Sequence, residues 1–478
     1  MMSSATVAGA WVPSERLIGL AAEALADLFP ADAARAGQVF AAPLGVAGDG
    51  EQVPLELVAA SVGARAMATD GAERLPLAPA DWSGLNPADQ RLAVWLRRHP
   101  SLGARERRWL SDRIYDVLRH GRAYECWLRQ AFDVAGGVEG DTRLHVARAL
   151  IELSAANTAG GASDSGVSLS ADQYRAWLSA QPSALRDSLP DWLWAGLVET
   201  HGQVTAGQLA EVLVQPAAIE IRTNLLKGKA QTLKARLAEA GVEADEVPGS
   251  NTALRLKGRP ALSRSPLFEA GWFEWQDVGS QQIAELCAAR RGERVVDFCA
   301  GAGGKTLALA ARMRNQGQVL AFDTEEARLS KLAPRLTRAG ISIVTSMRLD
   351  GCDDPRLARY QRWADLVLVD APCSGSGTFR RHPDLKWRLK PEDVGHYQAL
   401  QRQILQAAVR LVRPGGRLVY ATCSLLDQEN GQQMAWFGQW LAGQGGALAR
   451  MAQHGSQYWL PDSAGGDAFF MSEWRLPK

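Results

Sequence analysis

Two cysteines each follow a run of apolar residues that is typical of a buried strand. Cys373 lies in Asp370-Ala-Pro-Cys-Ser-Gly375, and Cys423 lies in Thr422-Cys-Ser424. A thiolate is a strong nucleophile, and nearby positive charge favours its formation. Strand-to-loop junctions are where reactive groups are commonly placed. If the two strands are neighbours, both thiols face one pocket, and we predict nucleophilic catalysis by a cysteine there.

A cysteine can also be structural or bind a metal. The chain holds six cysteines, and any one of them can be a small buried apolar residue, which we expect for Cys126 and Cys287 in helix-like runs. A metal bound by Cys299 with Cys373 and Cys423 is disfavoured, because no Cys or His stands at ligand spacing nearby. Without C-x-x-C spacing in so long a chain, a disulfide scaffold is also excluded. We therefore predict no metal site.

A glycine-rich turn, D-F-C-A-G-A-G-G-K-T over 297–306, suggests a second part of the site. It is not a Walker loop, because the required glycine five positions before Gly304 is Cys299. It is not a dinucleotide fingerprint either, because the last glycine position is Thr306. Asp323, about 20 residues further on, can accept hydrogen bonds from ribose hydroxyls. A ligand with a ribose and no pyrophosphate fits best, and S-adenosylmethionine is the cofactor that we predict.

The elements that must position these residues alternate as strand, loop and helix. Strands are expected at 294–298, 318–322, 342–349, 365–369 and 417–421, and the helices between them include 307–313 and 325–336. Such alternation predicts a parallel, doubly wound α/β sheet of Rossmann-like type. Ligands bind outside the carboxyl ends of the strands of such a sheet. Each expected strand finishes in or beside a Cys or an Asp, so this rim is the predicted site.

The remaining chain predicts further domains, since 478 residues correspond to about three. Apolar residues at helical spacing over 16–28 and 89–128 predict an all-helical domain at 1–156. A Gly- and Ser-rich stretch predicts a linker at 157–170. A strand at 218–224 and a helix at 230–240 predict a small α/β unit at 171–265, and the catalytic domain takes 266–478.

The charge balance looks neutral, with 53 basic and 52 acidic side chains and a net charge of +1. This excludes a uniformly basic nucleic-acid coat but not a local patch. Residues 91–122 hold nine arginines against three acids, which is either a solvated helical face or a phosphate-contacting one. No apolar run is long enough for a membrane span, and residues 1–30 do not resemble a signal peptide. We expect a cytoplasmic protein that binds no membrane, and a monomer by default.

The motifs together resemble those of a known family. D-F-C-A-G-A-G-G-K-T, D-A-P-C-S-G-S-G, R-R-H-P-D-L-K-W and Y-A-T-C-S-L-L-D-Q-E-N, all between Gln276 and Asn430, resemble the Sun/Fmu family of RNA cytosine-5 methyltransferases. The likeness is greatest to the bacterial enzymes that act on small-subunit ribosomal RNA. Arg105 to Arg119 resembles, more weakly, the NusB-like helical RNA-binding domain of some members. One departure is Gly301-Ala302, where the family often has Ala-Pro, so this turn is less stiff.

The resemblance implies roles for the thiols. Cys423 would attack C6 of the cytosine, so that C5 becomes able to take a methyl group. Cys373 would assist release of the methylated base, and Asp370 would hold or protonate the ring near N3. DNA cytosine methyltransferases instead attack with a Pro-Cys thiol, which makes Cys373 the rival nucleophile. The order of the cysteines does not decide between them, whereas the whole motif set favours Cys423.

The resemblance also implies contacts to the cofactor. Asp323 would bind the ribose, Asp350 the adenine amino group, and Asp370 would face both ligands. A carboxylate capping the next turn is the alternative for Asp350. The basic, aromatic loop 379–390, with Trp387, would contact an unstacked RNA strand. The residues implied for the methionine and ribose end are Cys299, Ala300, Gly301, Ala302, Gly303, Gly304 and Lys305.

The resulting prediction is an S-adenosylmethionine-dependent RNA methyltransferase that forms 5-methylcytosine, in small-subunit ribosomal RNA, through a covalent cysteine–C6 adduct. Two alternatives stay open. One is a catalytically silent RNA-binding or ribosome-assembly factor that keeps the fold, against which the presence of Cys373, Cys423 and Asp370 argues. The other is a methyltransferase that acts on a different nucleic acid, such as tRNA or DNA.

Overall fold

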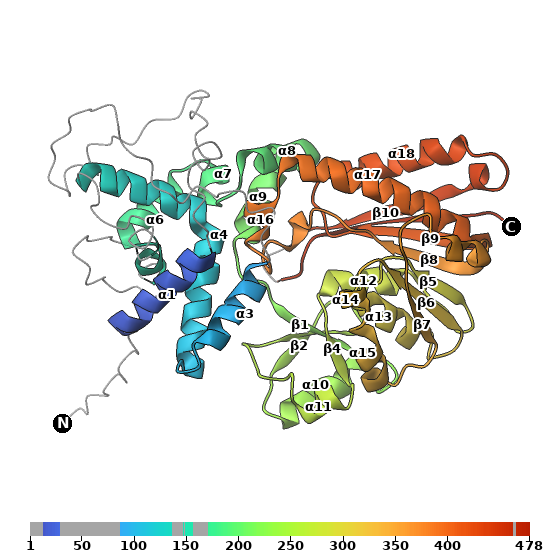
Figure 1. The fold of residues 1–478 in the computed structure, drawn as a ribbon, viewed down its shortest axis with the longest axis horizontal. Coiled ribbons are helices and arrows are strands. Elements are labelled where there is room, and N and C mark those ends of the chain that lie inside the picture. The colour runs from blue at the N-terminus through green and yellow to red at the C-terminus, as the bar shows by residue number, and fades with distance from the viewer. Residues whose placement is uncertain (1–12, 29–86, 136–146, 148, 156–170, 462–464) are drawn as a thin grey trace. The chain divides into compact units, whose positions relative to one another are not determined.

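A computed structural model describes the chain except for residues 1–12, 29–86, 136–146, 148, 156–170 and 462–464 (Figure 1). The chain divides into two compact units. One comprises residues 1–194 and 382–389, and the other comprises residues 195–381 and 390–478. The boundaries 1–156, 171–265 and 266–478 expected from the sequence stay predictions.

The amino-terminal unit is helical in its described part. A buried core that includes Leu25, Leu92, Leu110, Ile114 and Tyr174 holds the helices together. The long helix expected over 89–128 is interrupted at His99–Gly103, because Pro100 lacks the backbone N–H that a helix interior needs. The helices of this part of the chain are α1 Glu15–Leu28, α3 Ala88–Arg98, α4 Ala104–Ala135, α6 Ala171–Ser179, α7 Ser183–Arg186 and α8 Asp191–His201, which runs on into the second unit.

The second unit begins with a small antiparallel sheet in the order β2-β3-β1-β4. Its core joins Ile221, Leu254 and Phe273 to Leu233 and Leu237 of a helix that packs on one face. The predicted strand at 218–224 and helix at 230–240 are therefore confirmed. The elements here are α9 Gln203–Leu213, β1 Ile219–Thr223, α10 Ala230–Glu239, β2 Ala244–Glu246, β3 Ala253–Leu256, α11 Pro266–Glu269 and β4 Phe273–Trp275.

A seven-stranded sheet follows, in the order β10-β11-β9-β8-β5-β6-β7. The strands from β9 to β7 are parallel, and β11 and β10 run antiparallel at one edge. The predicted doubly wound, mostly parallel sheet is confirmed. Its strands are β5 Arg294–Asp297, β6 Gln318–Asp323, β7 Val344–Arg348, β8 Ala364–Asp370, β9 Val412–Thr422, β10 Ala452–Trp459 and β11 Phe469–Arg475.

Helices cover both faces of this sheet, with α17 and α18 on one side and α12, α13 and α15 on the other (Figure 1). The helix expected over 325–336 is in fact two helices, because Pro334 lacks the N–H that would bond to the Ser330 carbonyl in one continuous helix. The helices are α12 Val278–Leu286, α13 Gly304–Arg312, α14 Glu326–Leu329, α15 Leu332–Ala339, α17 Pro391–Ala408 and α18 Gly431–Ala442. Short 3₁₀ turns lie at Pro355–Tyr360, Ser376–Thr378, Val409–Leu411, Asp427–Glu429 and Leu448–Arg450.

The segment 382–389 is distant in sequence from the helical unit but folds as part of it. Its short helix α16, Leu385–Arg388, packs on α4, where Lys386 Nζ donates to the Arg119 carbonyl at 2.6 Å. Trp387 Nε1 donates to the Leu118 carbonyl at 2.7 Å. Burial lowers the pKa of Lys386. The sequence did not indicate that this segment belongs to the helical unit.

Candidate functional site

A cavity of about 660 Å³ lies at the carboxyl ends of the parallel strands, as the topology predicts. The sequence-predicted residues Asp323, Asp370, Cys373 and Cys423 all line it. Helix α17 supplies much of another wall. The remaining lining residues include Phe298, Cys299, Ala300, Lys305, Thr324, Glu325, Arg328, Leu349, Gly351, Cys352, Tyr397, Leu400, Gln403, Ile404 and Phe469.

The glycine-rich turn between β5 and α13 needs its glycines. Gly303 has φ of +82°, and a Cβ there would lie 2.1 Å from Leu332 Cδ1. Gly301 has φ of +55°, and a Cβ there would meet the Arg328 guanidinium. Only glycine adopts such backbone angles without strain. The turn therefore starts helix α13 in a conformation that places Cys299, Ala300 and Lys305 in the cavity wall and Gly301–Gly304 behind it.

Asp323 ends strand β6 at the edge of the cavity. Its Oδ2 accepts the Gly301 amide at 2.7 Å, and its Oδ1 accepts the Glu325 amide at 2.8 Å. A carboxylate oxygen has two lone pairs, so each oxygen can still accept one more hydrogen bond. These bonds fix the carboxylate against the turn, and the acceptor capacity that remains suits a ligand with a diol.

Two arginines hold the turn from behind. Arg222 of β1 donates to the Gly304 carbonyl at 2.6 Å, and Arg335 of α15 donates to the Ala302 carbonyl at 2.5 Å. Arg222 is buried, which lowers its pKa to about 10, and it also donates to Gln276. Arg335 is paired with Glu274 of β4 at 3.0 Å. The small sheet therefore supports the turn directly.

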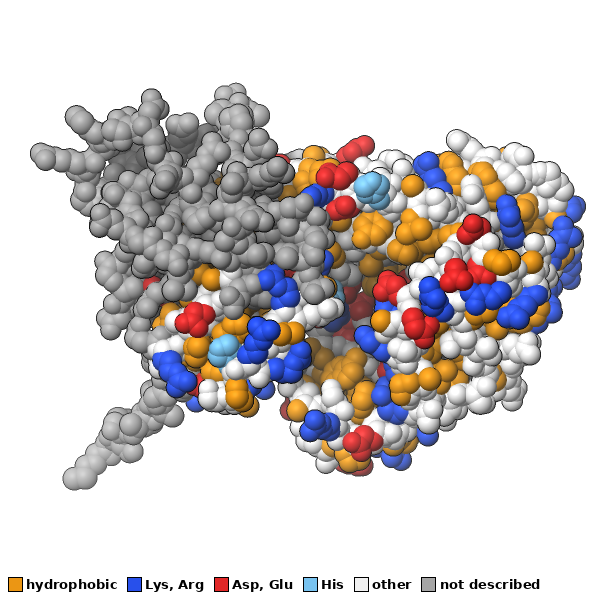
Figure 2. All heavy atoms as spheres, viewed as in Figure 1, with side chains coloured by type: hydrophobic (Ala, Val, Ile, Leu, Met, Phe, Trp, Pro, Cys, Tyr) orange, Lys and Arg blue, Asp and Glu red, His pale blue; other side chains and the backbone are white. Residues whose placement is uncertain are grey.

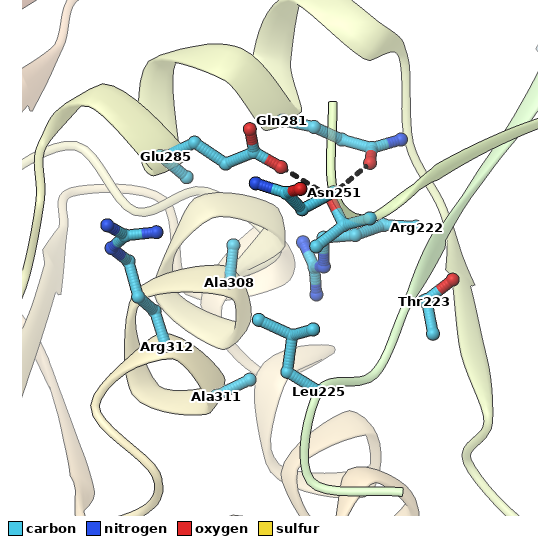
Figure 3. Close-up of a pocket in the computed structure, with 11 residues that line it drawn as sticks. Arg222, Thr223, Leu225, Asn251, Gln281, Glu285, Ala308, Ala311 and Arg312 are labelled. Atoms are coloured by element: carbon cyan, nitrogen blue, oxygen red, sulfur yellow. Dashed lines mark hydrogen bonds between the residues drawn. The ribbon is translucent and has the colours of Figure 1, made fainter. Parts of the chain in front are cut away.

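A small cavity of about 30 Å³ lies beside Arg222. Figure 3 shows the Arg222 side chain there, between α12 with Gln281 and α13 with Ala308. The Thr252 hydroxyl lies 2.9 Å from Gln281 Oε1 and 2.8 Å from Glu285 Oε1. This space is large enough for water but not for a cofactor.

Asp297 lies under the same turn, at the end of β5. Its Oδ2 accepts the Thr306 hydroxyl at 2.7 Å, whereas its buried Oδ1 has no hydrogen-bond partner. Burial raises the pKa of Asp297 to about 7. One donor does not replace the water that this carboxylate has lost, so the protonated form is favoured.

An ion pair joins the turn to the thiol side of the cavity. Lys305, in the first turn of α13, donates to Asp370 Oδ2 at 2.7 Å. The lysine side chain is buried, and Asp370 is about a third exposed, at 32%. Burial lowers the pKa of Lys305 and the Asp370 carboxylate raises it, and the net change is upward. Lys305 is therefore a firmly charged cation inside the cavity.

The two predicted cysteines lie together. Strands β8 and β9 are parallel neighbours, and Asp370 at the end of β8 pairs with Ala421 in β9. The chain turns into the cavity after each strand, and Cys373 Sγ lies 3.4 Å from Cys423 Sγ. The hydrogen bond with Cys423, together with burial, raises the pKa of Cys373 well above its usual value. Both effects favour the protonated form of Cys373.

A buried glutamate behind the thiols was not predicted. Glu429 is fully buried and accepts hydrogen bonds from Ser374, which follows Cys373, and from Ser424, which follows Cys423. The repeated Cys-Ser dipeptide was the available signal, because two inward serines need an acceptor. Arg222, Arg335 and the wall of α17 were missed as well, since nothing in their local sequence marks them.

Asp350 differs from the other predicted cofactor residues. Its neighbours Gly351 and Cys352 line the cavity, whereas its own side chain is 71% exposed and pairs with Arg348 and Arg356. Its amide donates to the carboxylate of Asp354 at 2.9 Å. The contact with adenine that the resemblance implies stays a prediction.

The structure bears differently on RNA contact by the two basic segments, 379–390 and 91–122. RNA contact by the loop 379–390 is wrong for Arg380 and Lys386, which are both 2% exposed. Arg380 donates to the Pro216 carbonyl at 3.0 Å, and Arg381 pairs with Asp277 and Asp467 at 2.5 and 2.7 Å.

Within 91–122, Arg107 donates to three carbonyls at the α3–α4 turn, those of Leu102, Leu96 and His99. Arg97, Arg98 and Arg108 are exposed. Figure 2 shows basic side chains on the surface of the amino-terminal helical unit. Contact of these exposed arginines with RNA stays a prediction.

Within the part of the chain that the structure describes, no group of three or more His, Cys, Asp or Glu residues is arranged to hold a metal ion. Among the same residues, no helix is long and apolar enough to cross a membrane.

The sequence matches two described families. Residues 284–475 match the family described as 16S rRNA methyltransferase RsmB/F, and residues 189–262 match the ferredoxin-like domain of RsmF/B-like methyltransferases. The second match overlaps the small sheet, and the first covers the seven-stranded sheet.

Individual proteins show the same similarity. A probable ribosomal RNA small subunit methyltransferase B of Synechocystis is 31% identical over 370 residues, which are 72% of this chain and 82% of that protein. The ribosomal RNA small subunit methyltransferase B of Erwinia tasmaniensis is 36% identical over 50% of this chain, which spans only 54% of that relative. A solved methyltransferase homologue of Pyrococcus horikoshii has a TM-score of 0.52 and 26% identity, and covers 62% of this chain and 97% of its own.

Proposed function

The chain belongs to the RsmB/F family of 16S rRNA methyltransferases, and we propose that it transfers a methyl group to C5 of a cytosine in small-subunit ribosomal RNA through a covalent cysteine adduct. The observation that carries the cytosine chemistry is the pair of thiols 3.4 Å apart in the cavity that also contains Asp323 and Lys305. A monomer in the cytoplasm stays our expectation.

The residues at the turn fit S-adenosylmethionine, the methyl donor of this family. Asp323 keeps acceptor capacity for the ribose hydroxyls, and the turn holds Cys299, Ala300 and Lys305 in the wall of the same cavity. Leu349, Cys352 and Ile404 give the cavity an apolar wall beside Asp323. The cofactor supplies an electrophilic methyl group on a sulfonium.

The protein's task is to make C5 of the base nucleophilic. In the proposed reaction the Cys423 thiolate forms a bond to C6, and electron density moves toward C5 and N3. C5 then takes the methyl carbon as the bond between that carbon and the sulfonium sulfur breaks, and the electron pair of that bond stays on sulfur as a neutral thioether. The proton on C5 leaves to a base, the S–C6 bond breaks, and the thiolate is regenerated with the methylated cytosine.

The charged pair in the cavity supports this order of events. Lys305 is a cation within range of Cys423, and nearby positive charge stabilises a thiolate. In this proposal Asp370 accepts a hydrogen bond from the base, and its ion pair with Lys305 supplies the proton that reaches N3 as charge develops there. Cys373, as a thiol beside the nucleophile, can exchange a proton during release of the base.

The test uses the full chain, S-adenosylmethionine with a labelled methyl group and small-subunit ribosomal RNA that lacks the modification. Cys423→Ala is expected to abolish methyl transfer and to form no adduct, because the attacking sulfur is gone. Cys373→Ala is expected to trap a protein–RNA complex that survives denaturation. The reverse result would assign attack to Cys373. No transfer by the wild-type chain to any cellular RNA would favour the assembly-factor alternative, and transfer to tRNA alone would replace the substrate.

A further inference from the structure

Resting on the proposed function, we propose that Glu429 is a positioning residue that holds the loops after β8 and β9, which carry Cys373 and Cys423 (the thiol loops), in fixed positions relative to each other. In this way it gives the thiols unequal roles, with Cys423 as the nucleophile and Cys373 as the proton carrier. Glu429 does not line the cavity, so it acts through its partners.

Glu429 connects three segments of the chain. Its Oε1 accepts the Ser374 amide at 2.9 Å and the Gln401 side-chain amide of α17 at 3.0 Å. Its Oε2 accepts the Ser374 and Ser424 hydroxyls, each at 2.5 Å. The serines directly follow Cys373 and Cys423, so one carboxylate fixes the chain immediately after both thiols.

Further bonds make this arrangement rigid. Gln401 also donates to the Pro372 carbonyl at 2.9 Å, and the Gly377 amide donates to the Cys423 carbonyl at 2.9 Å. The Ser376 hydroxyl accepts the Leu425 amide at 2.8 Å. Most of these polar groups are buried, where a hydrogen bond is stronger and an unpaired group is costly. The loops cannot shift separately without leaving buried donors unsatisfied.

The charges around the two thiols differ. Cys373 lies in the field of the Glu429 carboxylate, which adds to the rise in its pKa after the Cys423 hydrogen bond and burial. Burial raises the pKa of Glu429, and the serine hydroxyls oppose this by stabilising its charge. Cys423 instead lies in the field of Lys305. The anion behind Cys373 therefore opposes its ionisation, whereas the charge beside Cys423 is a cation.

The first experiment measures alkylation by iodoacetamide from pH 6 to 10, read at each cysteine by peptide mass spectrometry and without RNA. Cys373 is followed in the Cys423→Ser protein and Cys423 in the Cys373→Ser protein, each with and without the further change Glu429→Gln. We expect Glu429→Gln to shift the Cys373 profile to lower pH, so that its rate near pH 8 rises about tenfold, while the Cys423 profile stays in place. Equal shifts at both cysteines, or none, would overturn the proposal.

A second measurement separates positioning from general damage to the fold. Glu429→Gln is expected to lower kcat about 100-fold through misplacement of the loops, with an unchanged KM for S-adenosylmethionine. Glu239→Gln, an exposed change on α10, is the matched control. A KM change without a kcat change would refute a role at the thiols.

Ser374→Ala and Ser424→Ala provide a milder route if Glu429→Gln fails to fold. Each removes one hydroxyl donor from one loop, and Ser330→Ala, which is exposed, is their control. The proposal requires Ser374→Ala to alter the Cys373 alkylation profile more than the Cys423 profile, and equal effects would contradict it. Since alkylation needs no methyl transfer, these results stay interpretable even if the wild-type chain methylates no RNA.

Discussion

The two walls of the cavity are held in opposite ways. The glycine-rich turn directs carbonyl groups at two arginines, with Arg222 on Gly304 and Arg335 on Ala302. The thiol loops direct N–H and O–H donors at a single carboxylate, Glu429. Both supports are charge-assisted hydrogen bonds, which are stronger than neutral ones. The wall formed by the glycine-rich turn over 297–306 (the cofactor wall) is therefore fixed by cations. The wall formed by the loops that carry Cys373 and Cys423 (the thiol wall) is fixed by an anion.

The origin of each support differs too. The arginines connect the turn to the small sheet, through β1 and through Glu274 of β4. Glu429 lies only a few residues after β9, and its other partner is α17 of the same doubly wound domain. Damage to the small sheet should therefore weaken cofactor binding, whereas damage at Glu429 should slow the chemical step.

Among the variants that compare the two walls, the largest effect is expected where the walls meet, at the Lys305–Asp370 pair. Lys305→Met keeps an unbranched side chain that is one heavy atom shorter, but it removes the charge beside Cys423 and the proton near Asp370. We expect methyl transfer to fall about 1,000-fold, within the range for loss of an acid–base group. Lys257→Met is the control, since Lys257 pairs with Asp245 at 3.1 Å with both side chains 60% exposed. Activity within tenfold of wild type would remove the pair from the mechanism.

The next effect concerns the buried carboxylate under the cofactor wall. Asp297 has a pKa raised from 3.8 to about 7, whereas a free chain titrates it near 3.8. Between these values the folded state holds a proton that the unfolded state has released, so stability falls as pH rises from about 4 to 7 and is level above that. At about 1.4 kcal/mol per pH unit, the loss is on the order of 4 kcal/mol.

Asp297→Asn removes this dependence. Urea unfolding of both proteins from pH 4 to 8 should show the variant gaining on the wild type up to pH 7. The exposed change Asp245→Asn should leave the wild-type curve unaltered. A difference that grows as pH falls would mean that Asp297 is stabilised in its charged form, contrary to its single hydrogen bond from Thr306.

The sequence predicted the rim of the sheet well because each strand there ends in a residue with its own chemistry. The expected strand ends near Asp323, Asp370 and Cys423 agree with β6, β8 and β9, and the thiols share a cavity. Periodicity alone did not locate the break at Ser330-Lys331, although Pro334 in the first turn of α15 marks it, because proline has no N–H to donate to the Ser330 carbonyl. The fold could be predicted from the sequence where the local hydrophobic pattern of a segment agrees with its position in the folded protein.

The sequence-based prediction failed mainly for charged residues that are buried in the structure. Arg380, Lys386, Arg222 and Glu429 are charged residues, and charged residues are rarely fully buried, so a solvent-exposed position was the natural expectation. Each is buried because partners distant in sequence satisfy it, as Pro216 does for Arg380 and Arg119 for Lys386. A single sequence contains no record of those pairings, and the supports of the site were therefore invisible while its reactive residues were not.

A smaller effect tests the backbone of the cofactor wall. Gly303→Ala places a methyl group 2.1 Å from Leu332 Cδ1 and forces a φ of +82° on alanine. Strain of this kind costs about 1–3 kcal/mol, so thermal unfolding should occur at lower temperature and cofactor affinity should fall. Gly301→Ala should cost less, because the flexible Arg328 side chain can move away.

The double variant Gly303→Ala/Leu332→Ala separates the two causes. It removes the clash but not the strained φ, so it should regain part of the cofactor affinity in a titration with S-adenosylmethionine. Full recovery would mean that the clash alone mattered, and equal losses for Gly301→Ala and Gly303→Ala would mean that neither is decisive.

The smallest effect bears most directly on the difference between the walls. Arg335 and Arg338 both pair with Glu274, at 3.0 and 2.5 Å, but only Arg335 also donates to the turn, at the Ala302 carbonyl. Arg335→Ala should raise the KM for S-adenosylmethionine about tenfold, equivalent to one charge-assisted hydrogen bond, with kcat nearly unchanged. Arg338→Ala removes a similar ion pair and leaves the turn held, so its KM should stay near the wild-type value. If both variants raise KM equally, the turn depends on the charge balance at Glu274 and not on the hydrogen bond to Ala302. A fall in kcat instead would mean that the two walls act as one support.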